Sequence, residues 1–350
     1  MRFVRYGFLL IACILWLGGC FEPINQRLYR SHVIVDPFRY GDLYRLANLP
    51  QFREPKNPCG YSIKQTDSTG KALNLYMIGD SFTEGQFLNQ SDLPIHKLTW
   101  YHWYYNLNQA MQIDTTAQNV LLLETVERHL RERAAVPLNN PIVTSLPQGI
   151  TKDSQPQTSW LTSFASQIKT ALFMQYNISE RLEIVLFSHD FFLWFCELKA
   201  SLNLRFFNRV APTVALSKNK QHLFVGSDTD ATLPLTYPFS PLTDVEVERL
   251  VTQLNAIAAR FRKAGFDKVI LSVIPNKITL LEPDRGAYNH LIERVQQHPR
   301  LQLTVVDLYT PYSRMKKAPY AVGDAHWNCQ GRQIWLDAVA KALQNNEEHH

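Results

Sequence analysis

Short apolar runs that alternate with helix-forming segments are the strongest constraint on the fold of this 350-residue chain. Largely apolar runs lie at 73–78, 119–123, 268–274 and 301–307. Continuous apolar runs of this length are typical of strands that are buried on both faces, and the segments between them supply the covering helices. The sequence therefore predicts an α/β domain built on a parallel sheet.

The clearest helix signal begins at Thr243. Thr243 and Glu246 have the spacing of a capping box, apolar residues recur every three or four positions as far as Phe261, and Gly265 is placed to end the helix. Three further elements are predicted: an exposed, charged helix at 124–134, a hairpin at 214–225 and a closing helix at 331–343.

Three parts of the chain are expected from these patterns. Residues 1–20 form a signal segment or membrane anchor, and residues 21–69 form an irregular stalk that packs on the domain. Residues 70–345 form the main domain. Proline-rich loops, apolar helical material and the hairpin interrupt it at about 135–241, which predicts an insertion there.

The N-terminus predicts export. Arg2 and Arg5 precede an apolar run at 8–17, which is the pattern of a secretory signal or a short signal anchor. Small residues directly before Cys20 resemble a bacterial lipoprotein cleavage box and make Cys20 a candidate for lipidation. A lipoprotein, an uncleaved anchor and free secretion remain open as alternatives. All three place the main domain outside the cytoplasm, in the bacterial cell envelope.

Composition excludes some functions. The chain is 45% hydrophobic and 19% charged with a formal net charge of +5, as in ordinary globular proteins. The sequence contains no run of basic residues with interleaved aromatic residues, so nucleic acid is not an expected partner. The five cysteines have no zinc-ligand spacing, and no metal or cofactor is expected. One disulfide can form among Cys59, Cys196 and Cys329, without an indication of which pair.

A serine nucleophile is predicted at the end of the first apolar run. Residues 79–85 (Gly-Asp-Ser-Phe-Thr-Glu-Gly) place Ser81 just beyond a strand. The start of a following helix can direct N–H groups at negative charge that develops there. A serine is a weak nucleophile and needs a base. The alternative interpretation is a turn in which Asp80 and Ser81 cap a helix.

A base and its orienting carboxylate are predicted near the other end of the domain. Asp324 and His326 are two residues apart, on a loop before the closing helix. A carboxylate that holds an imidazole in one tautomer completes a catalytic triad. Ser81, Asp324 and His326 are therefore the candidate catalytic residues.

These motifs resemble the first and last blocks of the SGNH (GDSL-like) hydrolase superfamily. The Asp-Ala-His-Trp sequence at 324–327 is similar to that of SGNH-like proteins of polysaccharide O-acetylation, the relatives of alginate acetylation and DHHW-type proteins. Residues 126–128 and 275–277 also resemble that group. The resemblance spans roughly 73–340. It implies a flavodoxin-like three-layer α/β/α fold, and it makes 70–345 a catalytic domain for acyl-ester chemistry at the outer face of a membrane.

The sequence departs from the superfamily where oxyanion donors are expected. No glycine lies between Gly85 and Gly149, and 124–128 takes the place of the third block. Arg128 is the nearest replacement donor, because a guanidinium can stabilise an oxyanion. The alternative for Arg128 is an exposed helix residue paired with Glu124.

Two other residues are candidate substrate contacts. Asn276 follows an apolar strand, where open α/β sheets bind ligands, although turn chemistry explains it equally well. Trp327 adjoins the candidate base and either lines an acyl pocket or wedges the loop in place. The aromatic run at 100–105 either stacks on sugar rings or belongs to the core.

The expected function is O-acyl transfer, with acetyl as the expected group, to an exported polysaccharide through an acyl ester on Ser81. The resemblance implies a multi-span membrane acyltransferase as a partner that delivers the acyl group. Two alternatives remain open: a carbohydrate esterase or deacetylase with the same triad, and a non-catalytic glycan-binding or assembly subunit.

Overall fold

The computed structural model describes residues 2–20, 27–36, 38–43, 46–54, 59–60, 72–85, 87–104, 107–145 and 178–344. The chain forms two compact units. The N-terminal unit contains Met1–Lys56 and Gly149–Val210, and the sheet unit contains Asn57–Gln148 and Ala211–His350. Much of the expected stalk and residues 146–177 of the expected insertion lie outside the described residues.

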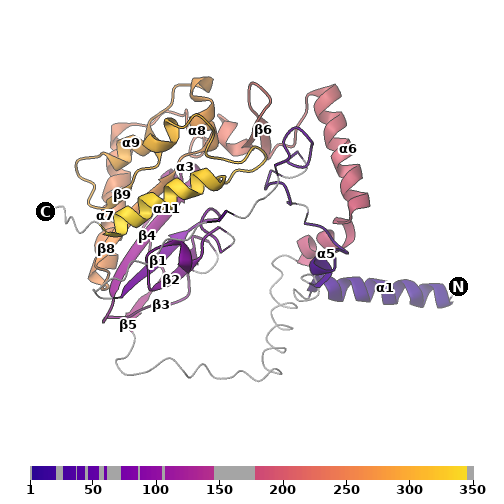
Figure 1. Cartoon of the computed structure of the whole chain (residues 1–350), viewed down its shortest axis with the longest axis horizontal. Helices are drawn as coiled ribbons and strands as arrows, with labels where there is room; N and C mark the ends of the chain where they lie inside the picture. The colour runs from indigo at the N-terminus through magenta and orange to yellow at the C-terminus, as the bar shows by residue number, and fades with distance from the viewer. Residues whose placement is uncertain are drawn as a thin grey trace. The chain divides into compact units, whose positions relative to one another are not determined.

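A parallel five-stranded sheet forms the centre of the sheet unit (Figure 1). Its strands are β1 (Leu73–Gly79), β2 (Lys97–His102), β4 (Gln118–Val126), β8 (Lys268–Ile274) and β9 (Thr304–Val306). They lie in the order β2-β1-β4-β8-β9, and every neighbouring pair is parallel. The predicted α/β fold with a parallel sheet is confirmed.

Helices cover both faces of the sheet. Alternate residues of each strand point to opposite faces, so each strand contributes to two separate cores. On one face, Tyr76 and Ile78 join a core with apolar residues of α7 (Asp244–Lys263). On the other, Leu75 and Met77 join a core with α11 (Cys329–Gln344). The sheet is thus a buried layer between helices, as the apolar strand sequences require.

Both predicted ends of α7 are confirmed. The Thr243 hydroxyl accepts a hydrogen bond from the Glu246 N–H at 3.2 Å. At the other end Gly265 has a φ of 106°, and its N–H donates to the Arg262 carbonyl. The Phe266 N–H donates to the Phe261 carbonyl, so the helix ends in a Schellman motif.

The predicted exposed helix at 124–134 is wrong at its start. β4 continues to Val126, Glu124 is fully buried within it, and only α3 (Glu127–Arg133) is helical. Buried ion pairs explain the difference. Arg133 pairs with Asp80, and Arg131 pairs with Glu246, so these charges face protein groups and not solvent.

The remaining elements of the sheet unit are short. The predicted hairpin is confirmed, since β6 (Val214–Leu216) pairs antiparallel with β7 (Leu223–Val225). The parallel pair β3 (Met111–Ile113) and β5 (Val143–Ser145) forms a separate ladder. The short helices are η1 (Gln90–Asp92), η2 (Gly226–Thr229), α8 (Lys277–Leu281), η3 (Pro283–Arg285), α9 (Leu291–Gln296) and α10 (Tyr309–Ser313).

The N-terminal unit contains α1 (Arg2–Cys20), α5 (Ile178–Phe187) and α6 (Asp190–Phe207). α1 covers the predicted signal or anchor segment and contacts α5. It ends at Cys20, whose side chain lies outside the described part. Among the described residues, no helix combines the length and apolar character that crossing a membrane requires.

Candidate active site

The sheet order places a ligand-binding edge beside the predicted nucleophile. From β1 the chain continues to β2 on one side of it and then to β4 on the other, so the order reverses at β1. Open parallel sheets bind ligands at such switch points, beyond the carboxyl ends of the strands. Ser81 lies two residues beyond the end of β1.

The turn at Ser81 requires a glycine before it. A Cβ at Gly79 would lie 2.3 Å from Thr83 Oγ1 and 2.9 Å from Glu124 Oε2. Next in the turn, the Asp80 N–H donates to Glu124 Oε2 at 2.8 Å. The Asp80 carboxylate in turn accepts the Phe82 N–H. The turn is therefore fixed on both sides of Ser81.

The structure brings the three predicted catalytic side chains together. Ser81 Oγ lies 2.8 Å from His326 Nε2, and His326 Nδ1 lies 2.6 Å from Asp324 Oδ1. A carboxylate only accepts, so Nδ1 carries the proton and Nε2 is left to accept from the serine. Asp324 Oδ1 also accepts the backbone N–H of His326 at 2.9 Å. The arrangement has the connectivity of a serine–histidine–aspartate triad.

Aromatic rings fix the imidazole. Phe87 stacks on His326 with ring centroids 4.9 Å apart, and Phe82 contacts it at 4.7 Å. Trp327 is buried and packs against Phe82 and Trp335, at centroid distances of 5.2 and 5.3 Å. Trp327 therefore belongs to the core that lies behind the imidazole.

Lys277 ties down the loop that carries Asp324 and His326. Its buried ammonium group donates to the backbone carbonyls of Ala321, Val322 and Asp324. Lys277 begins α8, and only Pro275 and Asn276 separate it from the end of β8. The loop is thus fastened to the sheet edge at a residue that the sequence analysis assigned no role.

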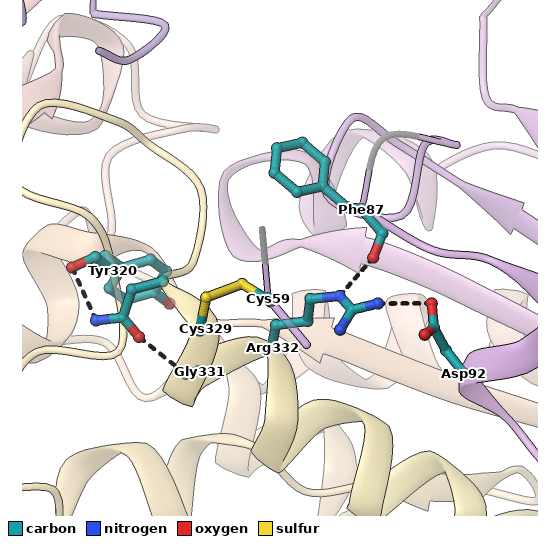
Figure 2. Close-up of a disulfide and its surroundings, with 8 residues drawn as sticks. Cys59, Phe87, Asp92, Tyr320, Cys329, Gly331 and Arg332 are labelled. Atoms are coloured by element: carbon teal, nitrogen blue, oxygen red, sulfur yellow. Dashed lines mark hydrogen bonds and ion pairs between the residues drawn. A yellow bond between two sulfur atoms is a disulfide. The ribbon is translucent and has the colours of Figure 1, made fainter. Parts of the chain in front are cut away.

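A disulfide and an ion pair fasten the start of α11 (Figure 2). Cys59 and Cys329 are bonded across 270 residues, which settles the pairing that the sequence left open. Arg332 donates to Asp92 at 2.5 Å and to the Phe87 carbonyl at 2.6 Å. Phe87, which stacks on His326, is therefore held by α11.

Buried charges lie beneath the nucleophile. Burial alone raises the pKa of Asp80, but the adjacent Arg133 guanidinium, together with the Phe82 N–H, outweighs burial and lowers it. The Asp80 and Arg133 side chains are 3.0 Å apart. Burial, reinforced by the Asp80 charge, raises the pKa of Glu124 well above its ordinary value. The two shifts are opposite: the Arg133 guanidinium favours the Asp80 anion, whereas burial disfavours the Glu124 anion.

Arg128 is not the exposed partner of Glu124 that one interpretation expected. It is largely buried and pairs with the buried carboxylate of Asp228, 100 residues away in sequence, at 2.7 Å. The backbone N–H of Arg128 also donates to Asn276 Oδ1 at 3.2 Å. The guanidinium is therefore already bound to an anion, which makes it a poorer oxyanion donor than a free one.

Asn276 is fully buried at the end of β8. Its backbone N–H donates to Glu127 Oε2 at 2.8 Å, and its Oδ1 accepts from Arg128. Within the described structure, its amide Nδ2 has no hydrogen-bond partner. The Ser81 N–H likewise has no acceptor among the groups described. Ser81 and Asn276 thus each carry an N–H donor without an acceptor in the described part of the sheet edge.

The aromatic run divides between core and surface. Tyr101 is buried, and the Trp100 and Trp103 indole N–H groups donate to Thr83 Oγ1 and the Glu124 carbonyl. Tyr104 is exposed, and Tyr105 lies outside the described residues.

The arrangement can activate a hydroxyl nucleophile at the strand ends, which is where open parallel sheets in general bind ligands. Comparison of the chain with protein-family models, curated protein sequences and solved structures finds no match. Function is therefore inferred from the geometry of the site and the sequence motifs.

Proposed function

We propose that this protein is a serine acyl enzyme. The observation that carries the proposal is the continuous hydrogen-bond chain from Ser81 through His326 to Asp324. An imidazole that accepts from a serine hydroxyl and donates to a buried carboxylate is the arrangement that activates serine toward acyl carbon.

The proposal extends to SGNH type and to O-acyl transfer, with acetyl as the simplest group, onto an exported polysaccharide. Counted in chain order, the sheet runs 2-1-3-4-5, which is the flavodoxin-like order that the superfamily resemblance implies. The Gly-Asp-Ser motif follows the first strand, and Asp324 and His326 precede the last helix. These positions support the resemblance.

In the proposed reaction, Ser81 Oγ attacks the acyl carbon of the donor ester as His326 Nε2 takes the hydroxyl proton. Asp324 stabilises the imidazolium, and the Ser81 N–H donates to the oxyanion, with Asn276 Nδ2 as a second donor. Collapse expels the donor alcohol, which receives the proton from His326. A sugar hydroxyl then loses its proton to His326 and attacks the Ser81 ester. Collapse breaks the bond to Ser81 Oγ, which receives the proton from His326, and the sugar leaves with the acyl group.

An extracytoplasmic location at a membrane is part of the proposal. The disulfide supports it, because such bonds persist mainly in oxidising compartments. α6 supports it as well, because Phe191, Trp194 and Phe206 are 64, 55 and 67% exposed. Large exposed apolar patches mark membrane or protein contacts. The resemblance adds a multi-span acyltransferase as the proposed source of the acyl group.

Transfer can be tested on the full chain in detergent with p-nitrophenyl acetate as donor and soluble oligosaccharides as acceptors. The expected result is slow release of free acetate and, with a suitable acceptor, an oligosaccharide that gains the mass of one acetyl group per transfer. Ser81→Ala is the control that should show neither.

Two outcomes would replace the proposal. Fast release of acetate that no oligosaccharide diminishes would indicate a carbohydrate esterase. A folded protein that forms no Ser81 ester, even when isolated from its native membrane, would indicate a non-catalytic glycan-binding or assembly subunit.

A further inference from the structure

Tyr104 presents an exposed ring at the edge of the sheet that carries Ser81. The described aromatic residues before it, from Trp100 to Trp103, are buried or half-buried, whereas Tyr104 is 56% exposed. Its backbone N–H donates to His102 Nδ1 at 3.1 Å. The ring contacts the rings of His102 and His129, at centroid distances of 5.8 and 6.4 Å. The protein therefore holds this ring in place at its surface.

The ring is tied to the nucleophile by two routes. Gly79 at the end of β1 pairs with His102 at the end of β2, so Ser81 and Tyr104 each lie two residues beyond this pair, and the Trp103 N–H donates to the Gly79 carbonyl at 3.1 Å. Adjacent strands lie about 4.8 Å apart. Below the edge, the Arg133 guanidinium lies 5.3 Å from the centre of the Tyr104 ring, and it pairs with Asp80, the residue before Ser81.

The groups around the ring carry no net positive charge. Arg133 and Asp80 compensate each other. Burial, aided by the charges of Arg133 and Arg128, lowers the pKa of His129 to about 4, and burial also lowers the pKa of His102. Both shifts favour the neutral form of the imidazole. Glu84 is close enough to influence His102 and adds negative charge, which disfavours an acidic sugar.

We propose that Tyr104 is the platform of an acceptor subsite that binds a neutral pyranose ring beside Ser81. The electron-rich face of an aromatic ring attracts the C–H groups on the flat face of a sugar. A sugar stacked there lies on the same strand-end edge as the Ser81 ester, where its hydroxyl can compete with water. This inference rests on the proposed function and adds the acceptor class to it.

Binding can be measured without chemistry on full-chain Ser81→Ala protein, with cellohexaose and xylohexaose as neutral probes and a mannuronate hexamer as an acidic probe. Tyr104→Ala in this background should weaken binding of a neutral probe by about fivefold, the scale of one aromatic contact. Tyr104→Phe should bind as the parent does, since it keeps the ring. Phe191→Ala, which removes a comparably exposed ring from α6, is the matched control.

A second measurement does not depend on the alanine variant folding. Protein labelled with 3-fluorotyrosine should show a shift of the Tyr104 fluorine signal, assigned by its loss in Tyr104→Phe, when the neutral hexaose is added. An unmoved signal, equal binding by Tyr104→Ala, or preference for the acidic probe would overturn the subsite. Fluorophosphonate labelling of Ser81 in wild-type protein tests the proposed function separately, so the two failures are distinguishable.

Discussion

The Lys277 ammonium group holds the loop of the candidate triad through three backbone carbonyls of residues 321–324. These carbonyls supply hydrogen-bond acceptors for the buried ammonium group, and the ammonium group in turn fixes their positions. Because Asp324 contributes one of these carbonyls, Lys277 controls the position of the carboxylate that orients His326. We therefore assign Lys277 a positioning role in the proposed reaction.

Lys277→Met should lower kcat for p-nitrophenyl acetate on the order of tenfold to a hundredfold and leave KM nearly unchanged, because displaced catalytic groups lose reactivity more than binding. Lys277→Arg should recover part of the loss. Lys268→Met is the matched control, since Lys268 also donates to a backbone carbonyl, that of Ala342 on α11. A kcat that falls only in proportion to the unfolded fraction would leave Lys277 with a purely structural role.

Glu127 gives the stability of the fold a pH dependence. Burial raises its pKa from 4.5 to about 7, although hydrogen bonds from Asn276 and Thr279 oppose the shift. The folded-state pKa lies above the unfolded one, so the stabilisation from the bound proton is fully present below pH 4.5 and is lost as the pH rises through 7.

Glu127→Gln imitates the protonated acid and should keep that stabilisation at pH 8. Urea unfolding measures the free energy of unfolding at pH 5 and at pH 8. Between these two pH values the wild type should lose up to about 3 kcal/mol more of it than the variant. Glu132→Gln changes a carboxyl that is 59% exposed on the same helix and should leave the wild-type pH dependence intact. If the free energy of unfolding changed equally with pH in Glu127→Gln and in wild type, the raised pKa of Glu127 would be contradicted.

At the scale of single residues, the sequence predicted candidate site residues that lie within short motifs. Ser81 sits in a Gly-Asp-Ser turn, and Asp324 and His326 are neighbours, so their types and spacing were informative. Partners distant in sequence were not predictable: Arg128 meets Asp228 only because α3 and η2 come together in the fold. Lys277 was also missed, because no local pattern shows that a lysine binds carbonyls more than 40 residues away.

At the scale of elements, the start of α11 joins the disulfide to the candidate site. Cys329 lies three residues after His326, and Arg332 on the next turn holds the Phe87 carbonyl. The bond closes a loop of 270 residues, so it restricts the unfolded chain strongly. The N-terminal end of the sheet unit is thereby fastened to the helix that follows the triad loop.

The paired substitutions Cys59→Ser and Cys329→Ser should lower the free energy of unfolding by about 2–4 kcal/mol. Denaturant unfolding of non-reduced protein measures the change. Cys196→Ser removes a free thiol from the N-terminal unit and should leave the unfolding of the sheet unit unaffected. Alkylation of Cys59 or Cys329 in unreduced, denatured protein would show that the bond is not formed.

Element prediction succeeded where local signals agreed. β8 matches its apolar run before Pro275, and α7 matches its cap and glycine. β2 was not recognised as a strand, because its large rings suggested either core or sugar contacts and it has no clear alternation. The charged end of β4 was assigned to a helix, because the sequence does not show which charges are buried in pairs.

At the scale of the whole molecule, the two units differ in surface character. The sheet unit buries its apolar residues between strands and helices, whereas α6 of the N-terminal unit exposes an apolar stripe (Phe191, Phe195, Leu198, Leu202, Phe206). Its acidic residues Asp190 and Glu197 are paired with Arg39. This pattern of apolar and aromatic residues resembles helices that lie in a membrane interface.

The proposed membrane location predicts that α6 contacts lipid even without an acyl chain on Cys20. Full-chain Cys20→Ser protein should bind anionic vesicles, and brominated lipids should quench a component of tryptophan fluorescence that Trp194→Phe removes. The combined substitutions Phe191→Ser, Phe195→Ser and Phe206→Ser should weaken vesicle binding. Trp335→Phe is the control, because Trp335 is buried in the sheet unit. Equal quenching of wild-type and Trp194→Phe protein would exclude α6 as a lipid contact.

The central claim, a nucleophilic Ser81 activated by His326, is tested most directly by intact-mass analysis after reaction with a fluorophosphonate. The wild-type chain should gain one phosphonyl group on Ser81, Ser81→Ala should gain none, and His326→Ala should react far more slowly because its serine lacks a base. Circular dichroism of each variant confirms that the fold is intact. A label that persists in folded Ser81→Ala protein, or a folded wild type that takes up no label, would contradict the triad.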